Sequence, residues 1–156
     1  MAEQVNNWLW AVIAWLGVIF FSSTSLASKW AEESFRTLAQ LIFGNLNPFS
    51  GSYGLFYLLT DKGFHVAMFC VFAVLLWRTL AHAENKVWVI LIAGAITGCC
   101  SELLQRLFPD RDPAVRDVLI NVGGTALGIA ACIVASRWKQ RRAQEPTAEP
   151  DPVLVD

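Results

Sequence analysis

Ionisable and amide side chains gather at one end of each of three apolar segments in this chain. They are Asp61, Lys62 and His65 at the start of one segment, Glu102 and Gln105 near the end of the next, and Arg111, Asp117 and Asn121 entering the last. Because successive membrane crossings reverse direction, all three polar ends face the same side. Charged groups inside a membrane are rare and usually functional, so we expect a site here.

One part of this set has the residue types of phosphoryl-ester catalysis. His65 is the candidate base or nucleophile, because histidine is the side chain most often used for proton transfer. Glu102 and Asp117 would orient His65 or hold a divalent cation. Asp61 is a further candidate catalytic residue. The residues do not identify a cofactor. A divalent cation is one option, and we assign no metal ligand set.

The remaining polar residues would bind rather than react. Lys62 and Arg111 would clamp phosphate oxygens, and the guanidinium of Arg111 can form two parallel hydrogen bonds with them. Gln105 and Asn121 would hydrogen-bond a head group. Without a partner, an ionised Glu102 at this depth is costly, so we expect it to meet Arg111, Lys62, His65 or a bound cation.

Composition places these residues in a lipid-embedded, all-α protein. Of the 156 residues, 55% are hydrophobic and only 16% are charged, and seven are Trp. No basic stripe with interleaved aromatic residues is present, which argues against a nucleic-acid partner. The four cysteines all fall in apolar runs and show neither a disulfide framework nor zinc spacing.

Hydrophobic runs predict a bundle of four transmembrane helices in one domain, residues 1–142. The expected spans are about residues 8–27, 61–78, 87–108 and 113–138. The first run resembles the apolar region of a signal peptide but lacks its basic flank and carries Glu3 instead. Asp112 and Pro113 look like the N-cap and first position of the last helix. Residues 143–156, rich in proline and acids, are expected to be disordered.

Between spans one and two, the pattern predicts a helix lying in the membrane interface. Residues 29–43 place Trp30 and three aliphatic residues near one face, with Lys29, Glu32, Glu33 and Arg36 spread over the rest. A solvated connecting helix is the alternative interpretation. Residues 45–54, with their Asn-Pro, Ser-Gly and Tyr-Gly steps, have the turn chemistry of a loop.

The last two spans should form a helical hairpin with polar groups facing inward. Only residues 109–111 separate them, which makes them antiparallel neighbours. Two small-xxx-small pairs, Gly94 with Gly98 and Gly124 with Gly128, would let helix backbones approach closely in this hairpin. Asp117 and Asn121 share a helical stripe with the second glycine pair, while Ser101 and Gln105 share one with the first.

The distribution of basic residues predicts the orientation. Bases gather on the C-terminal flank and on the linker between spans two and three, namely Arg137, Lys139, Arg141, Arg142, Arg78 and Lys86. By the positive-inside rule both termini are then cytoplasmic, and the polar cluster is extracytoplasmic. The expected location is the bacterial inner membrane, with several passes.

The order and spacing of these residues resemble the VanZ-like family of bacterial membrane proteins. The matching pieces are Asp61-Lys62-x-x-His65, Glu102-x-x-Gln105, Phe108-Pro109-x-Arg111 and Asp117-Val118-x-x-Asn121-x-x-Gly124-x-x-x-Gly128. The likeness covers roughly residues 22–128. It implies a small helical protein of the cell envelope, in a family named for a member that lowers susceptibility to the glycopeptide antibiotic teicoplanin. A remote relationship to membrane enzymes that exchange or hydrolyse phosphate-linked lipid head groups has been proposed for that family.

Three interpretations of the cluster remain open at this point. It could catalyse a reaction on phosphate-linked lipid head groups at the extracytoplasmic face, which could in turn affect glycopeptide susceptibility. It could bind an anionic lipid or glycan precursor without reacting. It could also be a structural network that only fixes helix packing. The sequence therefore leaves enzymatic activity undecided. The expected partner is a membrane lipid or a lipid-linked precursor, and no protein partner is identified.

Overall fold

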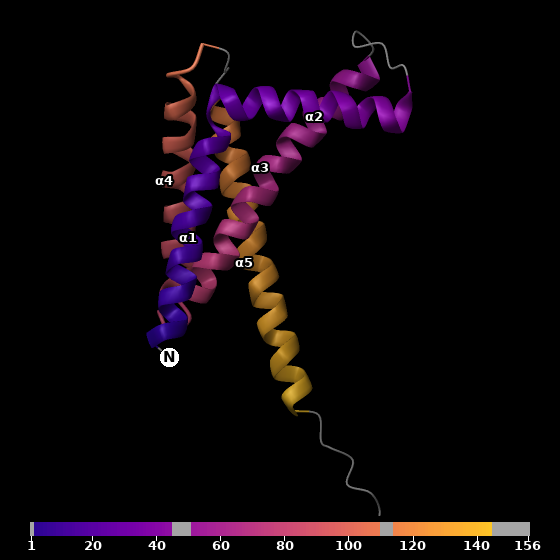
Figure 1. Cartoon of the computed structure of the whole chain (residues 1–156). Helices are drawn as coiled ribbons and strands as arrows, with labels where there is room; N and C mark the ends of the chain where they lie inside the picture. Colours follow the sequence, from indigo (N-terminus) through magenta and orange to yellow (C-terminus); the bar gives the residue numbers. More distant parts are fainter. Residues whose placement is uncertain (1, 45–50, 110–113, 145–156) are drawn as a thin grey trace, which may run out of the picture.

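The computed structural model describes residues 2–44, 51–109 and 114–144, with side chains for all of these except residues 2–6, 42–43 and 51–53. This part of the chain forms five helices and no strand, as the all-α prediction requires. The helices are α1 (Ala2–Ser22), α2 (Ser25–Phe43), α3 (Gly51–Thr79), α4 (Lys86–Gln105) and α5 (Val115–Gln144). In Figure 1, α1, α3, α4 and α5 form a bundle, and α2 lies across one end of it.

Three of these helices are long and apolar enough to cross a membrane. Within the described residues they are Gly54–Thr79, Lys86–Gln105 and Val115–Gln144. The helices α1 and α2 pass the same test only when taken together across a bend of 79°, so the chain has three spans, or up to four. The four-span count and the interfacial position of α2 stay predictions.

The bend between α1 and α2 differs from the expected continuous span over residues 8–27. The hydroxyl groups of Ser22 and Ser23 both donate to the carbonyl of Ile19, and Thr24 donates to Phe21. Such local bonds compete with the helical ladder. The hydroxyl of Thr24 also accepts from the backbone N–H of Ala27 and so caps α2. The chain therefore turns at this run of hydroxyls.

The other helix boundaries also differ from the sequence prediction. Helix α3 begins at Gly51, ten residues before the expected start, so residues 51–54 are helical and not part of a loop. Helix α4 ends at Gln105, and α5 continues to Gln144, six residues past its expected end. The predicted cap at Asp112 and Pro113 and most of the predicted disordered tail lie outside the described residues.

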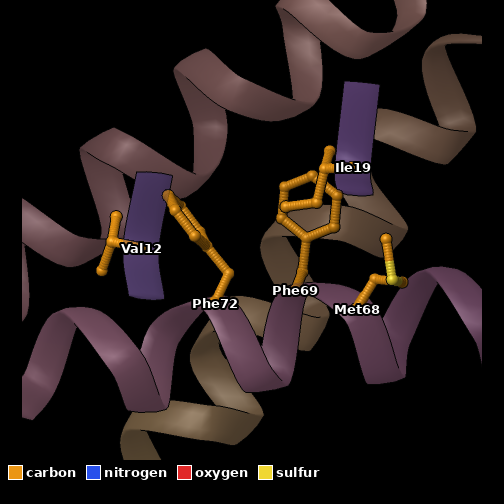
Figure 2. Close-up of a cluster of buried hydrophobic side chains, with 5 residues drawn as sticks. All are labelled: Val12, Ile19, Met68, Phe69 and Phe72. Carbon is orange, nitrogen blue, oxygen red and sulfur yellow. The ribbon is translucent and has the colours of Figure 1, made fainter. Parts of the chain in front are cut away.

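Helix α3 is the centre of the bundle and contacts α1, α4 and α5. On one side, Val12 and Ile19 of α1 pack against a row of large side chains of α3, which are Met68, Phe69 and Phe72 (Figure 2). Trp15 adds a hydrogen bond from its indole N–H to the carbonyl of Met68, at 2.9 Å. Burial of these large apolar groups holds α1 along α3.

On its other side, α3 packs against the hairpin of α4 and α5. Ala73, Ile90 and Ile129, one from each helix, form a second buried apolar cluster. Large apolar residues such as Trp88, Leu119 and Leu127 remain exposed on the outside of the bundle. An exposed apolar surface of this extent fits a surrounding of lipid.

Candidate functional site

Two side-chain hydrogen bonds join the middle of α3 to the first two turns of α5. Lys62 Nζ lies 2.9 Å from Asp117 Oδ2, and His65 Nδ1 lies 3.1 Å from Asn121 Oδ1. Residues three apart on α3 and four apart on α5 share a helix face, so each helix presents its pair to the other. The paired residue numbers rise together along both helices, and α3 and α5 are therefore parallel.

Two glycines of α5 bring the helices close enough for these bonds. A Cβ atom at Gly124 would lie 2.6 Å from the carbonyl oxygen of Val66, and one at Gly128 would lie 2.5 Å from that of Cys70. Both glycines thus face α3. This differs from the expectation that they pack within the α4–α5 hairpin, because α5 uses different faces for its two neighbours.

The hairpin instead uses the glycines of α4. A Cβ at Gly94 would collide with the side chain of Thr125, and one at Gly98 would lie 3.2 Å from the Cβ of Asn121. The order of these contacts shows that α4 and α5 are antiparallel, as the short connection predicts. Asn121 is fully buried between α3 and α4 because both neighbours approach it closely.

Lys62 lies between two carboxylates. Its Nζ is 2.9 Å from Asp61 Oδ2 and 2.9 Å from Asp117 Oδ2. The ammonium carries three donors, so two are used and one remains. The side chain of Asp117 is 8% exposed and that of Asp61 is 35% exposed, which places Lys62 at the edge of the buried region. An ion pair at such an edge keeps part of its hydration.

The bond to Asn121 sets the proton position on His65. The amide oxygen Oδ1 can only accept, so Nδ1 of His65 must carry the hydrogen in this bond. In the neutral ring the lone pair is then on Nε2. His65 is half-buried, and its ring is held at one nitrogen while the other can accept a proton or attack.

Glu102 is buried near the end of α4, on the side of the Lys62–Asp117 and His65–Asn121 bonds. Its Oε2 accepts a hydrogen bond from the backbone N–H of Ala114, at 3.2 Å, just before α5 begins. Lys62, His65 and Asp117 lie within electrostatic range of its carboxylate. The backbone N–H of Ala114 thus stabilises the Glu102 carboxylate, which was expected to pair with a cationic side chain.

Three buried polar atoms in this region have no hydrogen-bond partner among the described residues. They are Glu102 Oε1, Asp117 Oδ1 and Asn121 Nδ2. Buried side-chain polar atoms are satisfied in most proteins, and each exception calls for an explanation. Two of the three are carboxylate oxygens, and the second oxygen of each carboxylate already has a partner. We call the residues Asp61, Lys62, His65, Glu102, Asp117 and Asn121 the polar site.

A cavity of about 230 Å³ lies beside Glu102, between α4 and α5. Leu103 of α4 and Arg106, the residue directly after α4, line it together with Ala114 and Val118. His65 and Asp117 do not line this cavity, although both lie within electrostatic range of Glu102. The cavity adds Arg106 to the charged groups around the polar site.

Several expected site residues are placed less directly. Gln105 is buried on α4, one turn beyond Ser101. Arg111 lies outside the described residues, so its pairing with Glu102 stays a prediction. Within the described ranges, no group of three His, Cys, Asp or Glu side chains could hold a metal ion.

Two features around the polar site were missed from the sequence. Arg106 is four residues after Glu102, a spacing that brings side chains together on a helix and could have identified it. Ser23 of α1 is buried, and its hydroxyl is 2.8 Å from that of Ser101 on α4. No spacing rule links residues so far apart in the sequence, so only the fold reveals that α1 reaches this region.

The observed arrangement agrees with a family match over most of the chain. The model of the VanZ/LLP1 family matches residues 8–136. The chain belongs to the VanZ/LLP1 family. Neither the curated proteins nor the solved structures contain a match to it. Family membership and three helices long and apolar enough to cross a membrane together make it a VanZ-like membrane protein.

Proposed function

We propose that this VanZ-family protein binds the head group of a phosphate-linked lipid at its polar site and breaks a phosphate ester there, with His65 as the base. The observation that carries the proposal is a histidine fixed at Nδ1 beside buried carboxylate oxygens that have no hydrogen-bond partner among the described residues. A network that served packing alone would satisfy those oxygens. A bound head group with hydroxyl or ammonium donors would satisfy them.

The charges around the site are balanced rather than strongly basic. Asp61, Glu102 and Asp117 supply the carboxylates, while Lys62 and Arg106 supply cations; a further cation, Arg116, lies 3.9 Å from Asp117 through its Nε. The third donor of Lys62 would hold one phosphate oxygen. Arg111, outside the described residues, would hold another. The carboxylates would then select head groups that carry their own donors.

The proposed step is the hydrolysis of a phosphate ester. Nε2 of His65 takes a proton from a water molecule, whose oxygen forms a bond to phosphorus while the bond to the leaving alcohol oxygen breaks. The alcohol oxygen then takes the proton from His65. Asn121 keeps the ring oriented throughout, and Lys62 stabilises the negative charge on the phosphate oxygens. The products are a phosphate monoester or phosphate and a free alcohol.

A binder that does not react is the second candidate, and the pairing of Lys62 favours it. Two of the three ammonium donors are already held by Asp61 and Asp117, which leaves one for a phosphate. Binding without catalysis requires no more than that. In this case the protein would hold an anionic lipid or glycan precursor at the same place.

The proposed location follows from the charges at the opposite ends of the spans. A four-span protein with both termini in the cytoplasm would expose the polar site at the extracytoplasmic face of the bacterial inner membrane. Lipid-linked precursors of the cell envelope are displayed at that face. A change in glycopeptide susceptibility would then be a consequence of altered envelope lipids.

The test compares two histidine variants of the full chain in proteoliposomes. The substrates are phosphatidylglycerol and an isoprenyl-diphosphate-linked sugar, each labelled in the head group. We expect release of the label by the wild-type protein and by His82→Gln, since His82 is exposed on the linker. His65→Gln should lose release by about 10²-fold or more, the usual contribution of a general base.

Other outcomes separate the competing functions. Binding of a labelled lipid that is weakened by Asp117→Asn, with no release by any variant, would establish a binder. Equal release by His65→Gln and His82→Gln would refute the role of His65. Absence of both binding and release, with His65→Gln unfolding at a lower temperature, would leave packing as the role of the polar site.

A further inference from the structure

A second charged region lies at the opposite end of α3. There, a cavity of about 560 Å³ is bounded by the last turns of α3, the start of α4 and the C-terminal half of α5. Arg78, Lys86 and Lys139 line it, one from each helix. Along α3, Arg78 is about 24 Å from Lys62, so this cavity opens near the other surface of a membrane. Its volume is within the roughly 300–1,000 Å³ of ligand pockets.

The three cations of this cavity face no carboxylate. Its lining contains no Asp or Glu, and Glu84, the acid on the adjoining linker, is exposed and does not line it. None of the three bases forms an ion pair with any residue of the described chain. A cavity with three positive charges and no counter-charge attracts an anion.

Aromatic rings position two of the cations without neutralising them. Lys86 Nζ lies 4.1 Å from the centre of the Trp77 ring, and the guanidinium of Arg78 lies 5.7 Å from that of Trp8. Lys86 also donates a long bond of 3.4 Å to the carbonyl of Ala81. Contacts of this kind hold the side chains in place and leave donors for a ligand.

The rest of the cavity is apolar and lies between two spans. Val74 of α3 and Ala131 and Ala135 of α5 line it, and Ser136 adds one hydroxyl. Figure 1 shows that α5 crosses α3 and then separates from it toward this end. Small alanine side chains do not fill the space that the divergence creates. The cavity thus combines a basic rim with an apolar wall facing the hydrocarbon.

We propose that this cavity binds one anionic phospholipid. Its phosphate would be held by Arg78, Lys86 and Lys139, and an acyl chain would lie along Val74 and Ala131. The apolar wall favours a lipid over a soluble phosphate, because a soluble ion gains nothing from it. Basic pockets between spans on the cytoplasmic side are a known form of anionic lipid recognition. The lipid would link three helices at one end of the bundle, independently of the polar site.

Native mass spectrometry of the full-length protein in detergent tests this proposal. The probes are phosphatidylglycerol and phosphatidylcholine with identical acyl chains. We expect one phosphatidylglycerol molecule to be retained in preference to phosphatidylcholine. Arg78→Gln and Lys139→Gln should each weaken its retention roughly fivefold, from about 1 kcal/mol per basic residue near a lipid surface.

Matched variants distinguish a defined site from diffuse attraction. Arg141→Gln removes the same charge from the same end of α5 but does not line the cavity, so it should retain the lipid within about twofold. Lys139→Arg should also retain it. Lys139 is exposed on α5, so its substitution leaves the buried clusters intact, and unchanged thermal unfolding will verify this.

Three results would overturn the proposal. Equal retention of the two lipids would exclude recognition of the anionic head group. Equal losses in Lys139→Gln and Arg141→Gln would show that the charge acts diffusely and not in this cavity. Displacement of the lipid by millimolar glycerol phosphate or inorganic phosphate would show that the site recognises a soluble anion.

Discussion

The contact between α3 and α5 makes a sharp prediction about two adjacent glycines. A Cβ at Gly124 would lie 2.6 Å from the carbonyl oxygen and 2.9 Å from the Cα of Val66, both of which are backbone atoms. A helix backbone cannot relieve such a clash by changing rotamer, as a side chain can. Gly123, the preceding residue, has nothing within 4 Å of the same position. Gly124→Ala should therefore force α5 away from α3, and Gly123→Ala should not.

The size of this effect follows from the contact distances. Ordinary van der Waals contact begins near 3.4 Å, so α5 would have to move by about 0.8 Å from its present 2.6 Å contact. The same movement would stretch the Lys62–Asp117 and His65–Asn121 bonds from 2.9 and 3.1 Å to about 3.7 and 3.9 Å. Neither is a hydrogen bond at that length.

The energetic cost is large enough to measure. Overpacking costs about 1–3 kcal/mol, and loss of a hydrogen bond to a charged group adds about 1.5–3 kcal/mol. Thermal unfolding in detergent, followed by tryptophan fluorescence, should show a lower Tm for Gly124→Ala. Each kcal/mol corresponds to about 2–4 °C for a domain of this size. Gly123→Ala should be neutral or up to about 1 kcal/mol more stable, because alanine favours helix.

The comparison of the two alanine variants can refute the reasoning directly. If Gly124→Ala unfolds at the same temperature as Gly123→Ala, the helices do not approach as closely as described. If Gly124→Ala is destabilised but still binds and turns over labelled lipid as the wild type does, the two inter-helix bonds do not form the functional site. Loss of both stability and lipid release fits the proposed arrangement.

Three further predictions follow from the polar site and the charge distribution. Glu102→Gln keeps an acceptor for the backbone N–H of Ala114 and removes a buried charge. The free energy of unfolding should therefore change by no more than about 1 kcal/mol, while lipid binding or release is lost. A large loss of stability would instead support a packing role. Lys62→Met removes the closer of the two cations beside Asp117 and should destabilise the protein by up to about 3–5 kcal/mol, which chemical unfolding in detergent will measure. In Lys62→Met/Asp117→Leu much of that stability should return, and no return would contradict the pairing. Reporter fusions at Asp156 should be active only in the cytoplasm and fusions within residues 45–50 only outside it, and a periplasmic signal from Asp156 would overturn the four-span topology.

The inward-facing stripes are the part of the site that local sequence predicts well. Asp117, Asn121, Gly124 and Gly128 were placed on one face of a helix by their spacing, and all four are buried. On α4, Ser101, Glu102 and Gln105 are buried together with Gly94 and Gly98. A helix repeats every 3.6 residues whatever surrounds it, so spacing alone defines its faces.

Helix ends were harder to predict because they depend on weak, competing local bonds. The hydroxyls of Ser22, Ser23 and Thr24 end α1 and turn the chain by 79°, although no charged residue interrupts residues 8–27. At the start of α3, the ring of Phe35 of α2 packs against those of Phe56 and Tyr57, with ring centres 5.1 and 5.0 Å apart; the contact with Tyr57 is edge-to-face. This contact between two elements supports a helical turn that the local turn residues do not favour.

The sequence by itself determined the helical class, the family and the residues of the polar site's two buried stripes, because apolar length and helical period are local properties. Only the tertiary structure decided which stripes meet. It paired Lys62 with Asp117 and His65 with Asn121, and it turned Gly124 toward α3 rather than toward its hairpin partner α4. The physical reason is that α5 packs against both α3 and α4 with different faces, and the spacing of its residues does not encode which helix approaches which face.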